Sequence, residues 1–384
     1  MNMNDYIKWR GDLSFLNSPF NAIDGLIMAY LSYIDFDKCL SDKGSTVKEA
    51  ADKYFEIHGL DILESPIEFV RSSSTCLKEM AESERFKDCL IYNYVNIFHT
   101  DIAEQFSAIC VDVPYSPTVI AFRGTDDTII GWKEDLILSY GDIASQDDAI
   151  AYLEENVKWF KKYRVVGHSK GGFLAQYSVA YAKPEISKRV VQYISYDGPG
   201  LPNKAFRELD EDIRHKFLKV VPHSDIVGTI YPNECKQIIV KSSAAAMAAH
   251  SGFTWEVEGT RFITVEEPSI ESRLITEAFD SFINDTTVEQ RELFVDQFFA
   301  KIDEANVTTV SEFINGGLHV FYKVLKSVME MEEGSKEVAS IFMRKISQLI
   351  NEEVSEKIEA TREGVIEAAQ HLTDQAKEIL KIKK

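Results

Sequence analysis

The feature that most constrains the fold of this chain is a series of short, β-rich runs that alternate with helical patterns. The runs lie at 118–124, 163–169, 190–198, 217–223 and 235–243. Several of them are almost continuously apolar, as is typical of strands in a parallel sheet that helices cover on both faces. Between the runs lie amphipathic stretches, for example Asp148 to Lys161, that suit crossover helices. The pattern therefore predicts an α/β fold with a mostly parallel central sheet.

Further β-rich segments flank this series. We expect two hairpins, the first from 91–99 and 106–114 and the second from 253–259 and 261–267. The first hairpin would extend the sheet. Beyond Pro268 the strand signals stop and helical patterns replace them. The sequence therefore predicts two regions, an α/β domain over 1–267 and a C-terminal helical region over 268–384.

Helix-start signals and an apolar stripe mark the C-terminal region. Thr286 with Glu289, and Thr309 with Glu312, each fit a capping box that opens a helix. The last helix, from about Asn351, carries a narrow apolar stripe between Glu and Lys positions. Such a stripe is typical of helices that bind a partner or self-associate. We therefore expect self-association through this helix.

A serine flanked by glycines stands between one β-rich run and the helical pattern that follows it. Gly167-His168-Ser169-Lys170-Gly171 fits the G-x-S-x-G pattern of a nucleophile elbow. The serine of an elbow has a strained backbone, and a Cβ at either flanking position would collide with the strand or the helix. The strain holds the hydroxyl out at the positive end of the helix. Ser169 is therefore the candidate nucleophile.

Two other roles suit a glycine-rich turn between a strand and a helix. In the first, Ser169 merely caps the helix, and the turn has no chemical role. The second is a phosphate loop, but the pattern G-x-x-x-x-G-K-[ST] needs Ser or Thr after its lysine, and here Gly171 follows Lys170. The choice between an elbow and a cap depends on whether the chain also supplies an acid, a base and an oxyanion hole.

An acid and a histidine follow Ser169 in the chain order that hydrolases with a nucleophile elbow require. Asp225 comes after the β-rich run that ends at Val221, and His250 comes after the next run. Taken singly, Asp225 could cap a helix and His250 could be an ordinary loop histidine. Taken together, they favour a triad in which Asp225 orients His250 and His250 activates Ser169. Asp197, which ends the strand after the elbow helix, competes with Asp225 for the acid role.

Two backbone N–H groups are candidates for the oxyanion hole, which must face the negative charge that develops in acyl transfer. One is the N–H of Lys170, directly after the nucleophile. The other is the N–H of Thr125, because Phe122-Arg123-Gly124-Thr125 ends the first of the buried runs. An ordinary turn with Arg123 in an ion pair is compatible with the same role.

Charge and cysteine content argue against several classes of function. The chain has 384 residues and a formal net charge of −20, which disfavours nucleic acid and anionic membrane surfaces as partners. We expect no secretory signal, and no apolar run approaches the roughly 20 residues of a membrane helix. The five cysteines are scattered without a C-x-x-C pair, which favours free thiols in the cytoplasm over disulfides or a zinc site. We expect no metal and no organic cofactor.

The segments AFRGTDDTIIGWKEDL and VVGHSKGG resemble the class 3 lipases, with Trp132 and Asp135 at the matching spacing. The segment SDIVGTIYP is similar to the loop that carries the acid of those lipases. This similarity, and the Gly-Pro-Gly after Asp197 that suits a structural turn, favour Asp225 as the acid. The resemblance implies a nucleophile, an acid, a base and an oxyanion donor, namely Ser169, Asp225, His250 and Thr125.

More closely, the chain resembles a bacterial family of lipase-like proteins that are called Mbeg-like. It shares their N-terminal segment, the GHSKGG elbow, YDGPG after the next strand and a His-Ser-x-x-x-Trp histidine loop. The resemblance covers about residues 5 to 265 and implies an α/β-hydrolase fold. Class 3 lipases usually have a small or apolar residue where Lys170 stands, which argues against a plain triglyceride as the substrate.

These observations predict a serine hydrolase, of lipase or esterase type, that cleaves a small-molecule or lipid carboxylic ester through an acyl-enzyme on Ser169. The alternative is a catalytically idle hydrolase fold that acts as a binding or scaffold protein through its helical tail.

Overall fold

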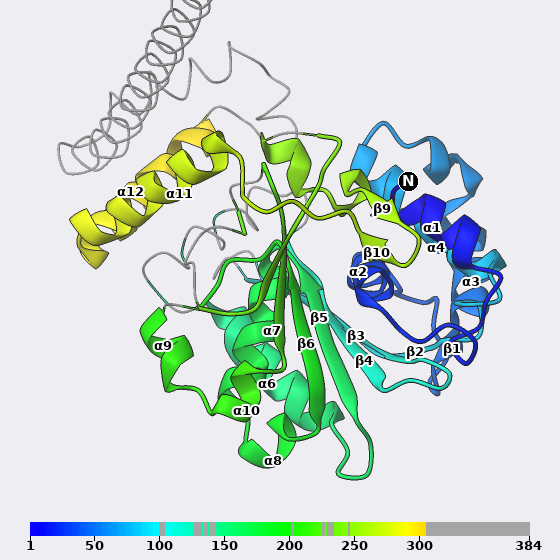
Figure 1. The fold of residues 1–384 in the computed structure, drawn as a ribbon. Helices are drawn as coiled ribbons and strands as arrows, with labels where there is room; N and C mark the ends of the chain where they lie inside the picture. The colour runs from blue at the N-terminus through cyan, green and yellow to red at the C-terminus, as the bar shows by residue number, and fades with distance from the viewer. Residues whose placement is uncertain are drawn as a thin grey trace, which may run out of the picture.

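The structure, a computed structural model, describes residues 1–99, 104–125, 133, 137, 141, 143–201, 203–224, 227–228, 234–244 and 246–304. Its centre is an eight-stranded sheet whose strands stand in sequence order, from β1 at one edge to β8 at the other (Figure 1). The strands are β1 Ser45–Thr46, β2 Leu90–His99, β3 Glu104–Asp112, β4 Thr118–Phe122, β5 Tyr163–His168, β6 Val190–Tyr196, β7 Phe217–Pro222 and β8 Gln237–Val240.

The predicted fold class is confirmed by the sheet. Strands β4 to β8 correspond to the five β-rich runs, and each pairs parallel with the next. Strands β2 and β3 form the first expected hairpin, and β3 joins the sheet by pairing antiparallel with β4. The protein is thus an α/β chain of the hydrolase type, with its parallel strands on one side of the sheet.

Helices cover both faces of the sheet, as buried parallel strands require. The crossover helices lie on one face: α6 Ala144–Asn156, α7 Lys170–Tyr181, α8 Pro184–Ser187, α9 Asn203–Glu208 and α10 Glu211–Arg214. The N-terminal helices lie on the other face (Figure 1). Side chains of β3 alternate between the two layers, because Ile109 and Val111 belong to one core and Ala108 and Cys110 to the other.

The N-terminal region contributes α1 Met3–Arg10, α2 Ala22–Leu31, α3 Val47–His58, the 3₁₀ helix η1 Leu60–Glu64 and α4 Glu68–Glu82. Capping boxes that begin at Asn2, Asn21 and Thr46 open three of these helices. Every residue of α2 from Ile23 to Leu31 is buried, because this helix packs between the sheet and the other N-terminal helices.

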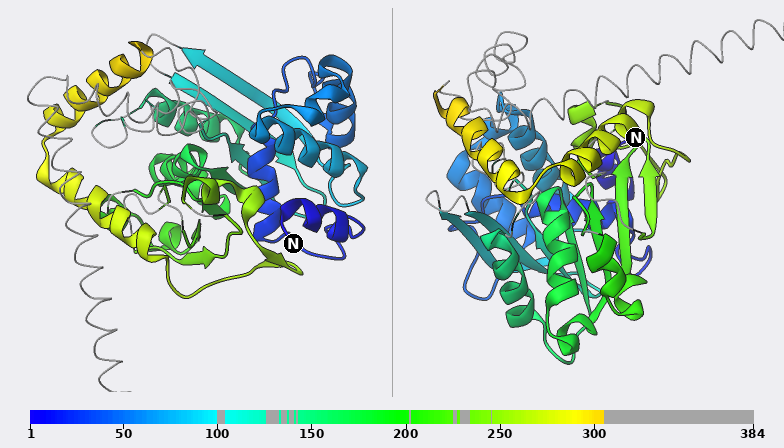
Figure 2. Two further views of the ribbon diagram at one scale, coloured as in Figure 1. Left: turned by 90° about the horizontal axis from the view of Figure 1, so that it is seen from above. Right: turned by 90° about the vertical axis from the view of Figure 1, so that its left-hand side faces the viewer.

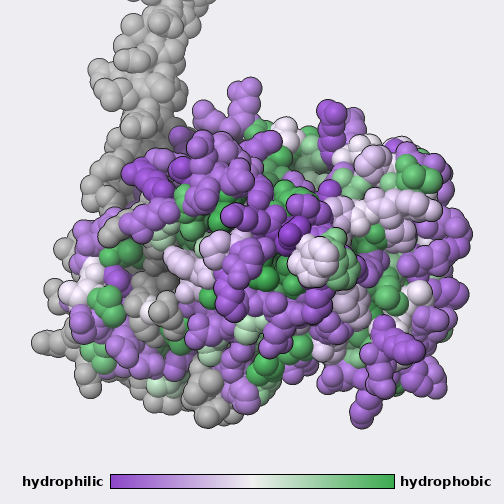
Figure 3. Space-filling model, turned by 90° about the horizontal axis from the view of Figure 1, so that it is seen from below, coloured by the Kyte–Doolittle hydropathy of each residue, from purple (hydrophilic) through white to green (hydrophobic). Residues whose placement is uncertain are grey.

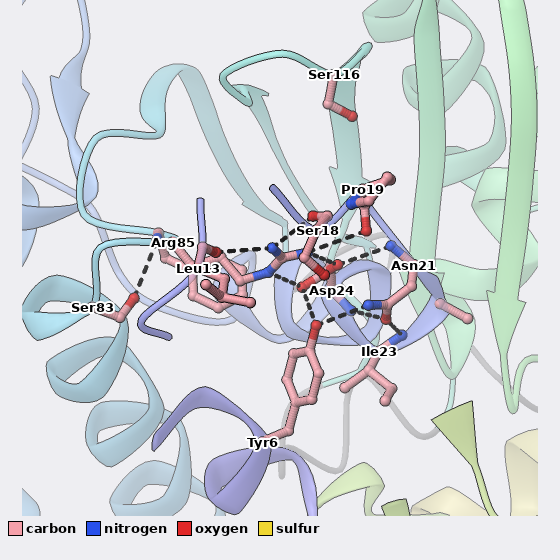
Figure 4. A network of polar contacts seen from close by, with 12 residues as sticks. Tyr6, Leu13, Ser18, Pro19, Asn21, Ile23, Asp24, Ser83, Arg85 and Ser116 are labelled. Atoms are coloured by element: carbon pink, nitrogen blue, oxygen red, sulfur yellow. Dashed lines mark hydrogen bonds and ion pairs between the residues drawn. The ribbon is translucent and has the colours of Figure 1, made fainter. Parts of the chain in front are cut away.

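A buried ion pair joins α2 to the turn that follows α4 (Figure 4). The carboxylate of Asp24 in α2 accepts bonds from Arg85 at 2.6 and 2.8 Å, and both side chains have no exposed surface. Tyr6 of α1 donates to the same carboxylate at 3.0 Å. The guanidinium also donates to backbone carbonyls, including that of Ser18 at 2.9 Å, and lies 3.9 Å from the ring centroid of Phe15. These contacts hold α1, α2 and the turn after α4 together.

The second expected hairpin is present but much shorter than expected. It consists of β9 Val257–Glu258 and β10 Arg261–Phe262, which form a separate two-stranded sheet. The segment before it forms two 3₁₀ helices, η2 Ala246–His250 and η3 Gly252–Thr254. Trp255 is fully buried after η3, and its indole N–H donates to the carbonyl of Ala249 at 2.9 Å.

Two helices follow the strands, α11 Ile270–Asp285 and α12 Val288–Glu304. Figures 1 and 2 place them on the opposite side of the molecule from α1–α4. The capping box of α12 pairs Thr287 with Gln290, one residue later than predicted from Thr286 and Glu289. The later helices expected from Thr309 and Asn351 lie outside the described residues. No helix within the described ranges is long and apolar enough to span a bilayer.

Candidate active site

Ser169 lies in the strained turn that the sequence predicts. It follows β5 directly and has φ 58° and ψ −132°, a combination that side chains with a Cβ rarely adopt. Ser169 occupies the N-cap position of α7, yet in the described part of the chain its side chain makes no capping hydrogen bond. The helix-cap interpretation is therefore wrong, because the hydroxyl does not perform that role.

The glycines around the serine are required by close backbone packing. A Cβ at Gly167 would meet the carbonyl of Gly171, and a Cβ at Gly171 would meet the backbone of Phe122 and Arg123. A Cβ at Gly124 would stand 3.0 Å from the Cβ of Ser169. The end of β4, the end of β5 and the start of α7 therefore touch one another at the elbow.

The carboxylate that the structure places against His250 is that of Asp197. His168 of β5 pairs with Tyr196 of β6, so Ser169 and Asp197 are the next residues beyond two neighbouring strands. One Asp197 carboxylate oxygen lies 2.7 Å from Nδ1 of His250, and the other accepts the Gly228 N–H at 3.1 Å. The carboxylate is fully buried. Asp197 itself has φ 54°, a conformation that Asp tolerates better than most residues.

This geometry reverses the preference for Asp225 over Asp197. Asp225 lies outside the described residues, whereas Nδ1 of His250 already faces a carboxylate oxygen of Asp197. The Gly-Pro-Gly after Asp197 has a second function besides forming a turn. A Cβ at Gly198 would stand 2.5 Å from the carbonyl oxygen of Ser169, so only glycine allows the acid to sit this close to the elbow.

His250 ends η2 and faces the elbow from the other side. Its side chain is 18% exposed, in contrast to the fully buried Asp197. When Nδ1 of the neutral ring donates to Asp197, Nε2 is the ring nitrogen that can accept a proton. The structure thus places His250 against Asp197, and His168, the residue directly before Ser169, lies 2.8 Å from the carbonyl oxygen of His250.

A second histidine fixes the backbone of the base. Nε2 of His168 lies 2.8 Å from the carbonyl oxygen of His250, and the two rings are 4.6 Å apart. A donor at Nε2 leaves Nδ1 of His168 to accept from the Tyr33 hydroxyl at 3.0 Å. Tyr30 accepts the N–H of Gly252 at 2.7 Å. Helix α2 and the residues directly after it therefore contact both His168 and the histidine loop.

The burial of His168 predicts a specific dependence of stability on pH. Burial, reinforced by the charge of His250, holds the pKa of His168 well below 6.5. The unfolded chain binds a proton at this residue near pH 6.5 and the folded chain does not, so stability is lost as pH falls below 6.5. His168→Gln should remove this loss, which is about 1.4 kcal/mol per pH unit at most. Urea unfolding at about pH 7.5 and pH 5.5 measures it.

The matched control is Ser243→Ala. Ser243 is exposed, carries no titratable group and donates to the carbonyl of Thr254, so its replacement should shift the unfolding free energy equally at both pH values. If His168→Gln also shifts the unfolding free energy equally at both pH values, His168 is not held neutral by the fold.

The two candidate oxyanion donors lie beside the nucleophile. The N–H of Lys170 is the first of α7, and half-buried Thr125 follows Gly124, whose backbone abuts Ser169. The Lys170 side chain turns away into the protein. It is 1% exposed, and its ammonium donates to the carbonyl of Gln105 in β3 at 2.7 Å. Lys170 therefore ties the elbow helix to β3, a role that the sequence did not reveal.

The site suits acyl transfer by a serine. Its groups lie at the carboxyl ends of β4, β5 and β6, and they are the hydroxyl of Ser169, the imidazole of His250, the carboxylate of Asp197 and the backbone N–H groups of Lys170 and Thr125. Among the described residues, no group of three or more His, Cys, Asp or Glu side chains could hold a metal ion. Trp132 and Asp135, which matched the lipase spacing, lie outside the described residues. Sequence reasoning missed Tyr30 and Tyr33, since a lone hydroxyl in an apolar helix carries no recognisable pattern.

Comparisons with known proteins found a family model and similar solved structures. The model of a family described as Mbeg1-like matches residues 80–300, more than half of the chain. The match reaches further toward the C-terminus than the resemblance over 5 to 265, and it leaves out the first helices. Two solved structures are similar. The crystal structure of M37 lipase is 16% identical, with a TM-score of 0.33, over 53% of this chain and 67% of that one. A native propeptide complex of Rhizomucor miehei lipase is 16% identical, with a TM-score of 0.33, over 58% and 69%. No curated protein matches the chain.

Proposed function

Because the chain belongs to the Mbeg1-like family, we propose that it is a serine hydrolase that cleaves carboxylic esters through an acyl-enzyme on Ser169. The observation that carries the proposal is the strained Ser169 beside a histidine whose Nδ1 lies 2.7 Å from the buried carboxylate of Asp197. Strain of this kind persists where the surrounding structure enforces it, and it is concentrated at reactive sites.

In the first half of the reaction, Oγ of Ser169 attacks the ester carbonyl while Nε2 of His250 takes the serine proton. The buried carboxylate of Asp197 keeps the proton of the ring on Nδ1 and stabilises the imidazolium that forms. The N–H groups of Lys170 and Thr125 face the oxyanion. His250 then returns its proton to the leaving alcohol, and the acyl group remains on Ser169.

In the second half, a water molecule gives its proton to His250 and attacks the acyl-enzyme, which releases the carboxylic acid and restores the Ser169 hydroxyl. His168 supports both halves, because its bond to the His250 carbonyl fixes the loop that carries the base. The substrate class is a small-molecule or lipid ester.

Covalent labelling tests the proposal. An excess of a fluorophosphonate probe should add one probe mass to the intact protein, and Ser169→Ala should abolish this adduct because Ser169 is the serine to which the proposal assigns a base. Ser224→Ala is the matched control. Ser224 lies in the turn after β7, where it donates to the carbonyl of Ala244, and its loss should leave labelling intact. Hydrolysis of p-nitrophenyl esters of graded chain length should follow the same pattern.

One observation favours the alternative of an idle hydrolase fold. Ser169 is only 7% exposed, so a substrate must reach a largely covered hydroxyl. If the wild-type protein stays unmodified under conditions in which a reference hydrolase reacts fully, the chain is not a serine hydrolase and the binding or scaffold role becomes the better account.

A further inference from the structure

The three most exposed large hydrophobic side chains of the described residues belong to two loops at one end of the sheet. They are Trp159 at 77%, Tyr115 at 76% and Phe160 at 65% exposure. Trp159 and Phe160 precede β5, and Tyr115 precedes β4. Both loops therefore lie at the amino ends of their strands, the end of the sheet opposite Ser169. Figure 3 shows the molecule from this end, where hydrophobic side chains emerge between hydrophilic ones.

Direct contacts hold the two loops together. Thr118 N–H donates to the carbonyl of Lys162 at 3.1 Å, and Lys161 pairs with Asp112 at 2.9 Å. Arg164 donates to Ser116 Oγ at 2.8 Å. The exposed aromatic residues therefore share one surface, although more than 40 residues of chain separate the loops.

The exposure of the aromatic pair is built into the fold. Val157 before it and Tyr163 after it are buried. The Tyr163 hydroxyl accepts the N–H of Lys158 at 2.9 Å, which closes the loop at its base. The rings of Trp159 and Phe160 then contact each other edge to face at 5.6 Å. Exposing apolar rings to water is unfavourable, and a group of rings that the fold holds exposed indicates an interaction surface.

Basic side chains surround the rings. Segments 112–116, 154–163 and 183–189 hold six basic residues against four acidic ones, although the whole chain carries −20. Two of the acidic residues, Asp112 and Glu154, are paired with lysines. Within the described ranges, Lys162, Lys188 and Arg189 form no ion pair, and both lysines are exposed. Arg189 lies against β5, because its carbonyl accepts the Tyr163 N–H at 3.0 Å.

We propose that this surface docks the protein on an anionic phospholipid bilayer. It comprises the aromatic residues Tyr115, Trp159 and Phe160 and the basic residues Lys158, Lys162, Lys188 and Arg189, and we call it the amino-end surface. Aromatic rings prefer the level of the lipid headgroups, and lysines near them attract anionic lipids. The remaining negative charge of the protein is screened beyond about 8 Å at physiological ionic strength.

A bilayer suits this surface better than a protein partner does. The aromatic side chains stand at the tips of two loops, and fluid lipid can enclose a tip of any shape. A protein partner would need a recess that complements each ring. The earlier expectation that anionic membranes are disfavoured rested on the net charge alone, and the local arrangement of charge overrides it.

In a protein docked through the amino-end surface, the edge of the sheet that carries Ser169 would lie away from the lipid. Docking of this kind does not depend on the chemistry of Ser169. Strand β5 runs from Tyr163 at the amino-end surface to His168 at the elbow. Its six residues span about 20 Å at 3.3 Å per residue. A protein docked in this way would be retained at the membrane while Ser169 faced the aqueous phase.

Flotation of the full-length protein with lipid vesicles tests the proposal. The protein should float with vesicles of equal parts phosphatidylcholine and phosphatidylglycerol, and much less with phosphatidylcholine alone. The double variant Trp159→Ser, Phe160→Ser should weaken binding on the order of tenfold, because the buried apolar area is lost. Lys158→Gln with Lys162→Gln should weaken it about 25-fold, since each lysine contributes about fivefold.

Trp9→Ser is the matched control. Trp9 is 48% exposed in α1 and stacks on Arg10, outside the amino-end surface, so its loss should leave flotation unchanged. Hydrolysis of a short soluble ester should be the same in all variants, which separates this proposal from the catalytic one. Failure of the wild-type protein to float with anionic vesicles would overturn the proposal, as would equal flotation of the aromatic variant. If light scattering instead shows that the aromatic variant dissociates an oligomer, the surface joins copies of this chain.

Discussion

Asp197→Asn should lower ester turnover by up to about 10⁴-fold, the loss seen for the corresponding change in a serine protease triad. An asparagine has nearly the same shape and can still bond His250, but it no longer requires a donor at Nδ1. The ring then adopts the wrong tautomer, and Nε2 cannot take the Ser169 proton. The protein should remain folded, since Gly228 can still donate to the amide oxygen. Steady-state kinetics with a soluble ester, together with circular dichroism, measure both effects.

Asp225→Asn is the matched control for Asp197→Asn, because the two residues follow consecutive strands and competed for the same role. We expect less than about a threefold change in kcat for Asp225→Asn, because Nδ1 of His250 has the Asp197 carboxylate as its partner. A larger loss at Asp225 than at Asp197, with both variants folded, would restore the assignment that the sequence favoured.

Asp24→Asn should lower the free energy of unfolding by about 3–5 kcal/mol, because it leaves the Arg85 guanidinium buried without its counter-charge. Arg85 has no exposed surface, and its remaining partners are backbone carbonyls such as that of Leu13 at 3.1 Å. Chemical denaturation followed by circular dichroism measures the loss.

Two comparisons define the cause of this loss. The exposed pair of Lys53 and Glu56 is the control, and Lys53→Gln should cost less than about 1 kcal/mol. The double variant Asp24→Leu, Arg85→Met should be more stable than Asp24→Asn, because it leaves no unpaired charge. If the double variant is the least stable of the three, packing rather than charge accounts for the effect.

The parallel half of the sheet could be predicted from the sequence because each of its strands is a short apolar run between polar turns. Helix α2 could not, since all residues from Ile23 to Leu31 are buried and no amphipathic period remains to be detected. The aromatic pair of the amino-end surface was assigned to a helix over 148–161, but α6 ends at Asn156 and the pair lies in the loop. A helical period cannot show where the last turn gives way to a loop.

The candidate nucleophile and the candidate base were chosen from local pattern and chain order, which could not decide between the two candidate acids. Asp197 and Asp225 both follow a strand, and chain order is the same for either choice. The difference is spatial, since His250 returns to the end of β6 and approaches Asp197. The offset in the α12 capping box has a similar origin, because Thr286 and Thr287 are adjacent and each is followed by a suitable acceptor three residues later.

The hydrogen bond between Tyr30 and Gly252 has a consequence for the order of folding. It joins residues 222 positions apart, and the bond between Tyr33 and His168 spans 135. Contacts between residues so far apart in sequence form late, because closing the long loop between them lowers the entropy of the chain before the contact stabilises the fold. The strained turn at Ser169 can form as soon as β5 and α7 pack against each other. The loop that carries His250 is anchored only later, when Gly252 has reached Tyr30. Secondary structure should therefore return on refolding before the candidate site is complete, and a chain that ends before Gly252 lacks the bond that anchors its histidine loop to Tyr30.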